Sequence, residues 1–285
     1  MDQGSEAAAP DSVVVTGLGH VVSLPCDPIP YLKVRKNRKM MGAQDDLAVV
    51  AAGKAIQSAG LGSPLGDRTG LYAAVGYIPF EETEIELLLQ GSLEGQAFSM
   101  ERFSTEGYNA VNPLLTFRCL SNMPAFHVSA NFDIQGPYFV TYPGPGQFYV
   151  ALEEAREALA SSRIDVAVVL GVAHQRNFLV RHHFSRIDPP ATELADAAGC
   201  VVLERADHAG ARSAVVRARL DECAVAYAPE DPFEKSRAPV ESGADSSLGP
   251  ASLPAALASG RGGRIRHELR SRDGIVASSV WTFAP

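Results

Sequence analysis

The sequence predicts an α/β protein in which buried strands alternate with helices in layers. Short apolar runs rich in β-branched residues recur along the chain, and stretches with helical periodicity lie between them. The 285 residues include 46% hydrophobic and 20% charged residues, which is ordinary for a globular protein with a sizeable core. We find no internal repeat that would favour a different architecture.

Composition excludes several classes of function. The net charge of −8 argues against nucleic acid as the main partner. The four cysteines show neither CxxC nor Cys/His spacing, so no metal site is predicted, and no cofactor is expected. Residues 1–12 lack the pattern of a signal peptide, and no apolar run is long enough to span a bilayer. We therefore expect a cytoplasmic protein with reduced thiols and no membrane contact.

The N-terminal third is predicted to contain a strand, a basic loop and a long helix. Residues 1–11 should be disordered, and residues 12–22 form a buried strand interrupted by Gly17 and Gly19. This glycine pair lacks the third glycine, the helix and the acidic residue of a dinucleotide site. Five cations follow, namely Lys33, Arg35, Lys36, Arg38 and Lys39. They indicate either a solvated loop or a docking patch for an acidic carrier or partner. An amphipathic helix is expected over residues 45–60.

Three further segments lead to the middle of the chain. Residues 69–76 read as a buried strand and residues 81–90 as an acidic helix. Residues 113–126 are predicted to form a helix that is apolar over most of its own surface. They should therefore be buried on several sides as core, or form the wall of an apolar channel.

Residues 134–148 hold the feature on which the functional reading depends. An aromatic strand over residues 138–142 is followed by a sharp turn at 143–146 and a helix from 148 to 161. Many α/β enzymes place a nucleophile at such a turn. This turn contains no Ser, Cys, Thr or Lys. The sequence therefore predicts the geometry of a nucleophile elbow without the nucleophile.

The remaining strands are predicted over residues 164–172, 197–204 and 213–220. Composition changes at Pro229, where a Pro, Ser and Gly-rich stretch to residue 250 reads as a linker or loose loop. A short helix at 253–259 and a last strand at 274–283 follow. The predicted organisation is a main domain over 12–228, a linker over 229–250, and a residual helix and strand over 251–285 that pack on the main domain.

Several segments together resemble the condensing enzymes of fatty-acid and polyketide synthesis, of the β-ketoacyl-ACP synthase II type. The first strand, Val-Val-Val-Thr-Gly-Leu-Gly at 13–19, is followed in order by the basic loop and helix. Asn122-Met and His-Val-Ser-Ala-Asn-Phe-Asp-Ile-Gln-Gly-Pro at 127–137 are similar to the segment before the family's nucleophile. Residues 155–171 and 196–204 resemble later elements. The resemblance covers roughly residues 12–220.

The resemblance implies a thiolase-like layered fold of α-β-α-β-α type, with its second half largely missing here. In the family a cysteine accepts the acyl chain, and its position falls on Pro145, which cannot be acylated. Neither of the family's two histidine motifs occurs, and His127, His182 and His183 lie outside such a context. We therefore expect no condensation by this chain alone. A shortened core should also expose apolar sheet unless a partner covers it.

A condensing-enzyme fold without the cysteine resembles the chain length factor, the ketosynthase β-subunit. That subunit often has Gln at the cysteine position, and this chain does not. The resemblance implies an obligate heterodimer with an active β-ketoacyl-ACP synthase and an indirect relation to acyl carrier protein. It assigns to the dimer interface the aromatic strand and a nearby glutamine, namely Tyr138, Phe139, Val140, Thr141, Tyr142 and Gln147. It assigns to the wall of the acyl tunnel Leu115, Phe117, Leu120 and Met123, with Leu120 nearest the gating position.

Two other functions remain open from the sequence. The chain could perform acyl transfer, hydrolysis or cyclisation with other residues on the same fold. It could also be a carrier-docking scaffold without influence on a tunnel.

Overall fold

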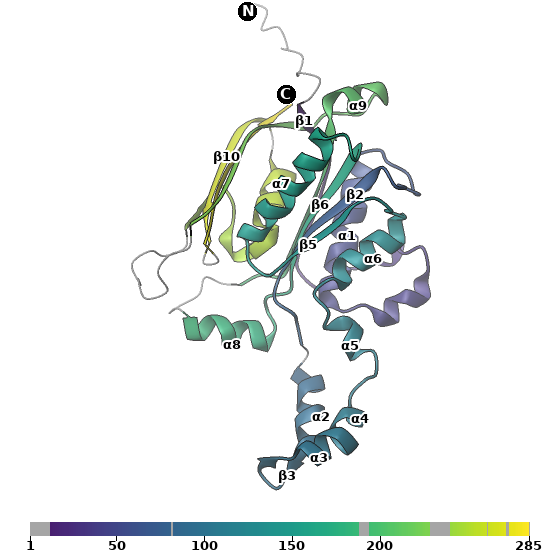
Figure 1. Cartoon of the computed structure of the whole chain (residues 1–285), viewed down its shortest axis with the longest axis vertical. Coiled ribbons are helices and arrows are strands. Elements are labelled where there is room, and N and C mark those ends of the chain that lie inside the picture. Colours follow the sequence, from purple (N-terminus) through teal and green to yellow (C-terminus); the bar gives the residue numbers. More distant parts are fainter. Residues whose placement is uncertain are drawn as a thin grey trace, which may run out of the picture.

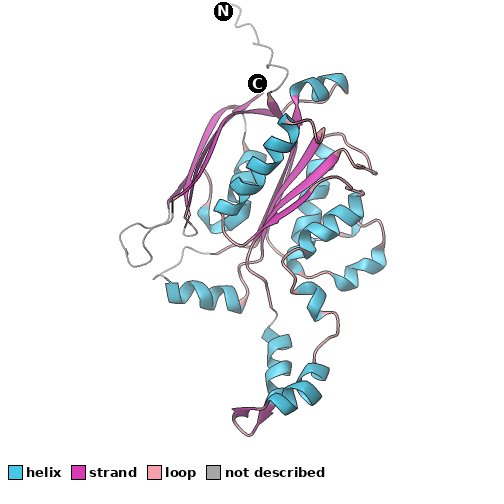
Figure 2. Ribbon diagram, in the orientation of Figure 1, coloured by secondary structure: helices cyan, strands magenta, loops and turns pink. Residues whose placement is uncertain are grey.

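The computed structural model describes residues 12–80, 82–187, 194–228, 240–260, 262–271 and 274–284. Its centre is a nine-stranded mixed sheet with the strand order β5-β2-β6-β7-β1-β8-β11-β10-β9 (Figures 1 and 2). Its strands are β1 (Val13–Val22), β2 (Thr69–Val75), β5 (Tyr138–Thr141), β6 (Val166–Ala173), β7 (Ala197–Arg205), β8 (Ala218–Tyr227), β9 (Val240–Ser242), β10 (Gly263–Arg270) and β11 (Ile275–Phe283). β5, β2 and β6 are parallel, and the other pairings are antiparallel.

Helices cover the sheet and extend one end of the molecule. The α-helices are α1 (Ala43–Ser58), α2 (Glu82–Ser92), α3 (Met100–Arg102), α4 (Tyr108–Ala110), α5 (Leu115–Arg118), α6 (Met123–Phe132), α7 (Gly146–Ala160), α8 (Phe178–Ile187), α9 (Ala206–Ala211) and α10 (Ser252–Ser259). Shorter helical turns are η1 (Ile29–Tyr31), η2 (Arg35–Met40), η3 (Phe103–Gly107) and η4 (Ser246–Ala251). A separate hairpin joins β3 (Leu93–Glu94) to β4 (Ala97–Phe98).

The central strands β2, β6 and β7 are buried on both faces. Along β2, Leu71 and Ala73 face the core beneath α1 and α6, whereas Tyr72 and Ala74 face the core beneath α7. Burial on both sides explains why β2, β6 and β7 are almost continuously apolar in sequence. The α/β layered class predicted from the sequence is confirmed.

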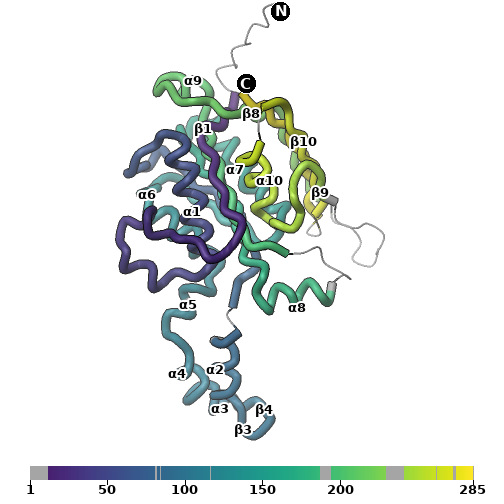
Figure 3. The backbone as a smooth tube through the Cα atoms, turned by 180° about the vertical axis from the view of Figure 1, so that it is seen from behind, coloured from purple at the N-terminus to yellow at the C-terminus, as the bar shows by residue number. Residues whose placement is uncertain are grey.

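The four strands β8, β11, β10 and β9 form a second layer on the far side of α7 and α10 (Figures 1 and 3). Their inner face carries Leu220, Leu269 and the fully buried Trp281, which share one core with α7 and α10. In the described residues the layers are therefore helix, sheet, helix and sheet. Among the helices that the structure describes, none covers the outer face of this second sheet, as the thiolase-like fold with a largely missing second half predicts.

The outer face of the second sheet is polar. Ion pairs join Arg264 to Glu222, Arg266 to Glu268, and Arg219 to Asp221. Strands that alternate between apolar and charged residues suit an antiparallel sheet with one face in water. The expectation that the shortened fold exposes apolar sheet is wrong for this face, because its outward positions carry charges that water solvates.

The glycine pair in β1 serves packing. A Cβ at Gly17 would lie 2.1 Å from the carbonyl oxygen of Ala55, and one at Gly19 would lie 2.3 Å from that of Ala51. The backbone of α1 therefore lies directly against β1, and only glycine permits this approach. This is the physical reason for glycine at these two positions.

Several elements differ from the sequence-based expectations. The helix predicted over residues 113–126 is two helices, α5 and α6, separated by residues 119–122. β8 begins at Ala218 instead of residue 213. His182 and His183 lie in α8, a helix that was not predicted. β10 was not predicted. Within the predicted linker, residues 240–242 and 246–251 form β9 and η4, with Leu248–Ala251 buried. The predictions for residues 1–11 and 229–239 lie outside the described residues.

Residues 82–110 form a projection that we call the arm. It comprises α2, β3, β4, α3, η3 and α4, and hangs below the layered body (Figure 1). Its elements pack on one another, and none of its residues belongs to the hydrophobic cores of the body. None of the described helices, in the arm or elsewhere, combines the length and apolarity needed to cross a membrane.

Candidate functional site: the edge strand and the turn before α7

β5 lies at one edge of the sheet and leads into the turn before α7. It pairs in parallel with β2 on one side, from Leu71 opposite Tyr138 to Ala74 opposite Thr141. In the described residues its other side meets no strand, so the backbone groups there are available for pairing with another chain. A cis peptide bond between Tyr142 and Pro143 starts the turn.

Pro145 is the N-cap residue of α7, with helical backbone angles of φ −64° and ψ −30°. Its ring is half-buried and offers no nucleophilic atom. The backbone N–H of Gln147 donates to Gly144 O at 3.1 Å, and that of Phe148 donates to Pro145 O at 3.2 Å. Since these two first-turn N–H groups are already engaged within the turn, the elbow has neither a nucleophile nor those donors free to bind an oxyanion.

Three of the four thiols do not replace the missing nucleophile. Burial raises the pKa of Cys26 to about 11, and it also raises the pKa values of Cys200 and Cys223. These three thiols are therefore protonated at neutral pH, whereas the thiolate is the reactive form.

The histidines nearest the core are occupied by structural contacts. His267 Nδ1 lies 2.7 Å from Tyr149 Oη, and His267 Nε2 lies 2.8 Å from a Glu241 carboxylate oxygen. Tyr149 Oη also contacts Ser279 Oγ at 2.7 Å. This buried network connects α7 to β9, β10 and β11, so it ties the second sheet to the body.

His127 lies beneath the N-terminus of α1. Burial lowers its pKa to about 4, so the ring is neutral at neutral pH. Its Nε2 is 3.9 Å from Asp45, and burial raises the pKa of that carboxyl group to about 7. Two groups with pKa values shifted in opposite directions can indicate acid–base chemistry. Here both side chains are almost fully buried, so we assign them to packing in the core.

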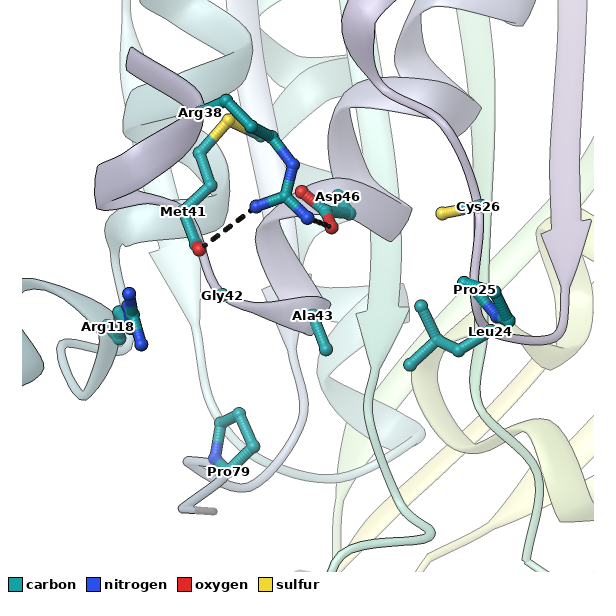
Figure 4. A pocket seen from close by; sticks show the side chains of 10 residues that line it. All are labelled: Leu24, Pro25, Cys26, Arg38, Met41, Gly42, Ala43, Asp46, Pro79 and Arg118. Carbon is teal, nitrogen blue, oxygen red and sulfur yellow. Dashed lines mark hydrogen bonds and ion pairs between the residues drawn. The ribbon is translucent and has the colours of Figure 1, made fainter. Parts of the chain in front are cut away.

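A pocket of about 500 Å³ opens at the N-terminus of α1, below η2 (Figure 4). Arg38 donates to Asp46 at 2.6 Å across it, and burial raises the pKa of Asp46 to about 6 against the effect of Arg38. Asp46 Oδ1 is buried and has no hydrogen-bond partner among the described residues. The lining residues are Leu24, Pro25, Cys26, Arg38, Met41, Gly42, Ala43, Asp46, Pro79 and Arg118. The only thiol among them is the protonated Cys26.

No group of three His, Cys, Asp or Glu residues in the described parts of the chain could hold a metal ion.

The predicted interface residues occupy three environments. Tyr138 and Tyr142 are 47% and 40% exposed. Phe139 and Val140 point to opposite faces of the sheet and pack against its two cores. Thr141 is buried, and its hydroxyl lies 3.0 Å from the carbonyl oxygen of Gln147, which is half-buried in the first turn of α7. The strand therefore presents two tyrosines and an open backbone edge.

The predicted tunnel residues are distributed over α5, α6 and the link between them. Phe117 and Leu120 are 45% and 47% exposed, Leu115 is half-buried, and Met123 is buried. The first two are neither core nor the wall of an internal channel of this chain. None of the four lines the pocket of Figure 4.

The five cations of the basic segment are exposed but differ in their pairing. Lys33 bonds to Asp133 at 2.6 Å, and Arg38 bonds to Asp46. In the described part of the chain, Arg35, Lys36 and Lys39 form no ion pair. These three are free to meet an acidic partner.

One aromatic cluster beside β5 was not predicted. Tyr77 lies 6.0 Å from Tyr142, 4.7 Å from His183 and 5.9 Å from Phe184, measured between ring centroids. It extends the aromatic surface of β5 onto α8. The helical spacing of residues 178–187, with its apolar face, was the available signal.

The fold agrees with the family comparison. A model of the β-ketoacyl synthase N-terminal domain matches residues 26–209. The chain belongs to the β-ketoacyl synthase family. No curated protein matches the sequence.

Solved ketosynthase structures share the fold at low sequence identity. A type II polyketide synthase ketosynthase complex with acyl carrier protein, AntDE:AntF, contains a chain with 14% identity and a TM-score of 0.73. The match covers 96% of this chain and 99% of that one. A β-ketoacyl synthase from Burkholderia phymatum has 14% identity, a TM-score of 0.69, and coverage of 96% and 100%. The ishigamide ketosynthase/chain length factor has 14% identity, a TM-score of 0.68, and coverage of 97% and 100%.

Coverage separates these structures from modular ketosynthases. The module 1 ketosynthase of the bacillaene synthase from Bacillus amyloliquefaciens matches 97% of this chain, but the match covers only 76% of that chain. The shortened synthase fold seen here therefore has counterparts of matching extent among solved structures.

Proposed function

We propose that this chain is a non-catalytic, chain-length-factor-type partner of an active β-ketoacyl-ACP synthase. It forms an obligate heterodimer with that subunit and shapes its acyl tunnel in type II polyketide, polyene or fatty-acid-like biosynthesis. The observation that carries the proposal is Pro145, the N-cap residue of α7. Counted from Gly136 and Pro137, it stands at the position where the family resemblance implies the acyl-accepting cysteine. A synthase fold that retains this turn without a nucleophile is suited to support catalysis by another subunit.

The surface around β5 supports a heterodimer. The strand has an open backbone edge and exposes Tyr138 and Tyr142, and Tyr77 continues the aromatic surface. Aromatic side chains are enriched at protein interfaces, where they bury a large area at low entropic cost. An open strand edge beside them can extend a sheet across the interface.

Two of the solved structures favour this role by analogy. One is described as a ketosynthase/chain length factor and one as a ketosynthase complex with its acyl carrier protein. At 14% identity these matches bear on the fold, and the pairing is our inference from the features above.

The tunnel role rests on Phe117 and Leu120. Both are large apolar side chains exposed on this chain, and they lie on a short segment that ends at α6. Side chains of this kind can complete the wall of a cavity that the partner opens at the interface. We assign Leu120 the gating position, with Leu115 and Met123 supporting it.

The basic segment is the proposed site for an acidic carrier. Arg35, Lys36 and Lys39 are exposed and unpaired in the described structure, so docking there would break no ion pair with the body. Such contacts steer association and weaken with salt.

Co-expression with an active β-ketoacyl-ACP synthase from the same source organism tests the proposal. We expect a soluble complex that condenses acyl units, and a Cys→Ala change in the partner should abolish this activity. In contrast, Pro145→Cys in this chain, expressed alone, should not create activity. A soluble and fully active partner obtained without this chain would contradict the proposal.

A second experiment separates tunnel shaping from simple scaffolding. Leu120→Trp should shorten the product of the complex, because a larger side chain fills tunnel volume. Val215→Trp is the matched control, since Val215 is 69% exposed on a loop before β8. Unchanged product length with Leu120→Trp would support a scaffold without tunnel function.

A further inference from the structure

The arm exposes an unusual amount of apolar surface for its size. Its exposed side chains are Leu87 at 48%, Leu89 at 49%, Phe98 at 56%, Met100 at 67% and Tyr108 at 62%. Single apolar side chains are common on protein surfaces, but a group within one small projection indicates an interaction site. Burial of these side chains by another molecule would recover hydrophobic free energy that the isolated chain leaves unused.

The arm is a defined structure, which makes it suited to present this surface. A Cβ at Gly91 would lie 2.7 Å from Gly107 Cα, so α2 and η3 cross with their backbones nearly in contact. Ser92 is fully buried at this crossing and donates to Leu88 O at 2.5 Å. The Ser99 hydroxyl accepts from Arg102 N and caps α3. A preorganised arm loses less conformational entropy when it binds.

The arm is also strongly acidic. Residues 82–110 contain six glutamates and one arginine, a net charge of −5 in a chain whose total is −8. The arginine, Arg102, pairs with Glu106 inside the arm. The glutamates are Glu82, Glu84, Glu86, Glu94, Glu101 and Glu106. The complementary surface must therefore be basic as well as apolar.

We propose that the arm is a docking element that seats on a basic, apolar surface of the partner synthase subunit. This inference rests on the proposed heterodimer and adds a second contact to the β5 edge. The apolar side chains supply most of the affinity, and the glutamates determine orientation and speed association.

A second copy of this chain fits the arm less well. The basic residues 33–39 offer three unpaired cations, but the large exposed apolar side chains next to them in sequence are Ile29 and Val34. Two such side chains cannot cover the five apolar side chains of the arm. Two copies would also bring together two chains of net charge −8. An acidic carrier would be repelled by the arm, which separates this surface from the basic segment.

The test uses the co-purified complex and two arm variants. Phe98→Ser with Met100→Ser removes apolar contact, and Glu94→Lys with Glu101→Lys reverses charge. The matched controls are Val215→Ser and Glu157→Lys, which change exposed residues on the body. Circular dichroism and thermal unfolding establish that each variant folds. Analytical ultracentrifugation over a dilution series at low and high salt gives the dissociation constants.

We expect the apolar variant to raise the dissociation constant by about tenfold or more, and the controls to leave it nearly unchanged. The charge variant should weaken the complex mainly at low salt, because salt screens exposed charges. Arm variants that bind like the unsubstituted chain would overturn the arm as a docking element while leaving the heterodimer intact. Arm-dependent self-association of this chain alone would instead assign the surface to a second copy. No complex with the unsubstituted chain would contradict the proposed function itself.

Discussion

The outer face of the second sheet and the surface formed by the β5 edge and the arm are both uncovered in the described structure. They differ in chemistry. The sheet face carries ion pairs such as Arg264 with Glu222, whereas the edge and arm expose Tyr138, Tyr142 and Phe98. The first surface is adapted to water, and the second is adapted to contact with another molecule. A shortened fold therefore does not by itself argue for a partner, and the proposed heterodimer rests instead on the distribution of exposed apolar side chains.

The largest effect is expected from Trp281→Ala, which tests how firmly the second sheet is attached to the body. Trp281 is fully buried on the inner face of the second sheet, and its indole N–H donates to Ser279 Oγ at 2.8 Å. Removal should leave a cavity between the two sheets and lower the free energy of unfolding by about 3–5 kcal/mol. Urea unfolding followed by circular dichroism measures the change. A loss below about 1 kcal/mol would mean that the second sheet is a loosely attached appendage.

A second test concerns the buried carboxyl group of Asp45 and the pH dependence of stability that it causes. Asp45 is almost fully buried, and burial raises its pKa from 3.8 to about 7, so the folded state binds a proton that the unfolded state releases. Its contribution to stability is therefore fully present below pH 3.8 and lost as pH rises towards 7. Asp45→Asn should remove this loss. The stability of the variant relative to the original should rise between these two pH values by at most about 4 kcal/mol.

Chemical unfolding at several pH values measures this difference. Because His127 lies 3.9 Å away and has a pKa lowered to about 4, the His127→Gln variant is the control for its opposing pH dependence. A pH-independent difference between the asparagine variant and the original would mean that Asp45 is ionised in the fold.

The partner-adapted side is tested by replacing Tyr138 and Tyr142 with lysine. Both side chains are exposed, so the melting temperature of the chain alone should change little. The dissociation constant of the proposed heterodimer should rise by about tenfold to a hundredfold, because two aromatic anchors are lost. Calorimetry on the chain and ultracentrifugation on the complex separate the two effects. Tyr227→Lys is the matched control, since Tyr227 is 72% exposed at the end of β8. An unchanged dissociation constant would place the interface away from β5.

The sequence predicted the layered fold because its main strands are buried on both faces. Continuous apolar runs such as β6 and β7 allow few alternatives. The turn at Pro143–Gly146 was also predictable, since proline and glycine restrict the backbone locally. The second sheet was harder. β10 alternates charged and apolar residues, and its partner β9 follows a segment whose composition indicated a loop.

Site features that depend on tertiary placement were not predictable. The apolar residues 113–126 were consistent with one buried helix, but the chain breaks at residues 119–122 and leaves Phe117 and Leu120 at the surface. Exposure depends on whether another segment covers a residue, and sequence periodicity does not report this. The contact of Tyr77 with Tyr142 joins residues from two separate strand ends, so no local pattern indicated it.

The smallest effect is expected on the outer face of the second sheet. Arg264→Ala removes an ion pair whose two side chains are 61% and 63% exposed. Water and salt screen such a pair, so the free energy of unfolding should change by less than about 0.5 kcal/mol. Association with the partner should not change either, if this face remains in water in the complex. Unfolding curves and the ultracentrifugation series measure both quantities. A marked weakening of the complex would instead place the partner on this face, and the contrast between its polar surface and the apolar β5 edge would then reflect two different kinds of interface.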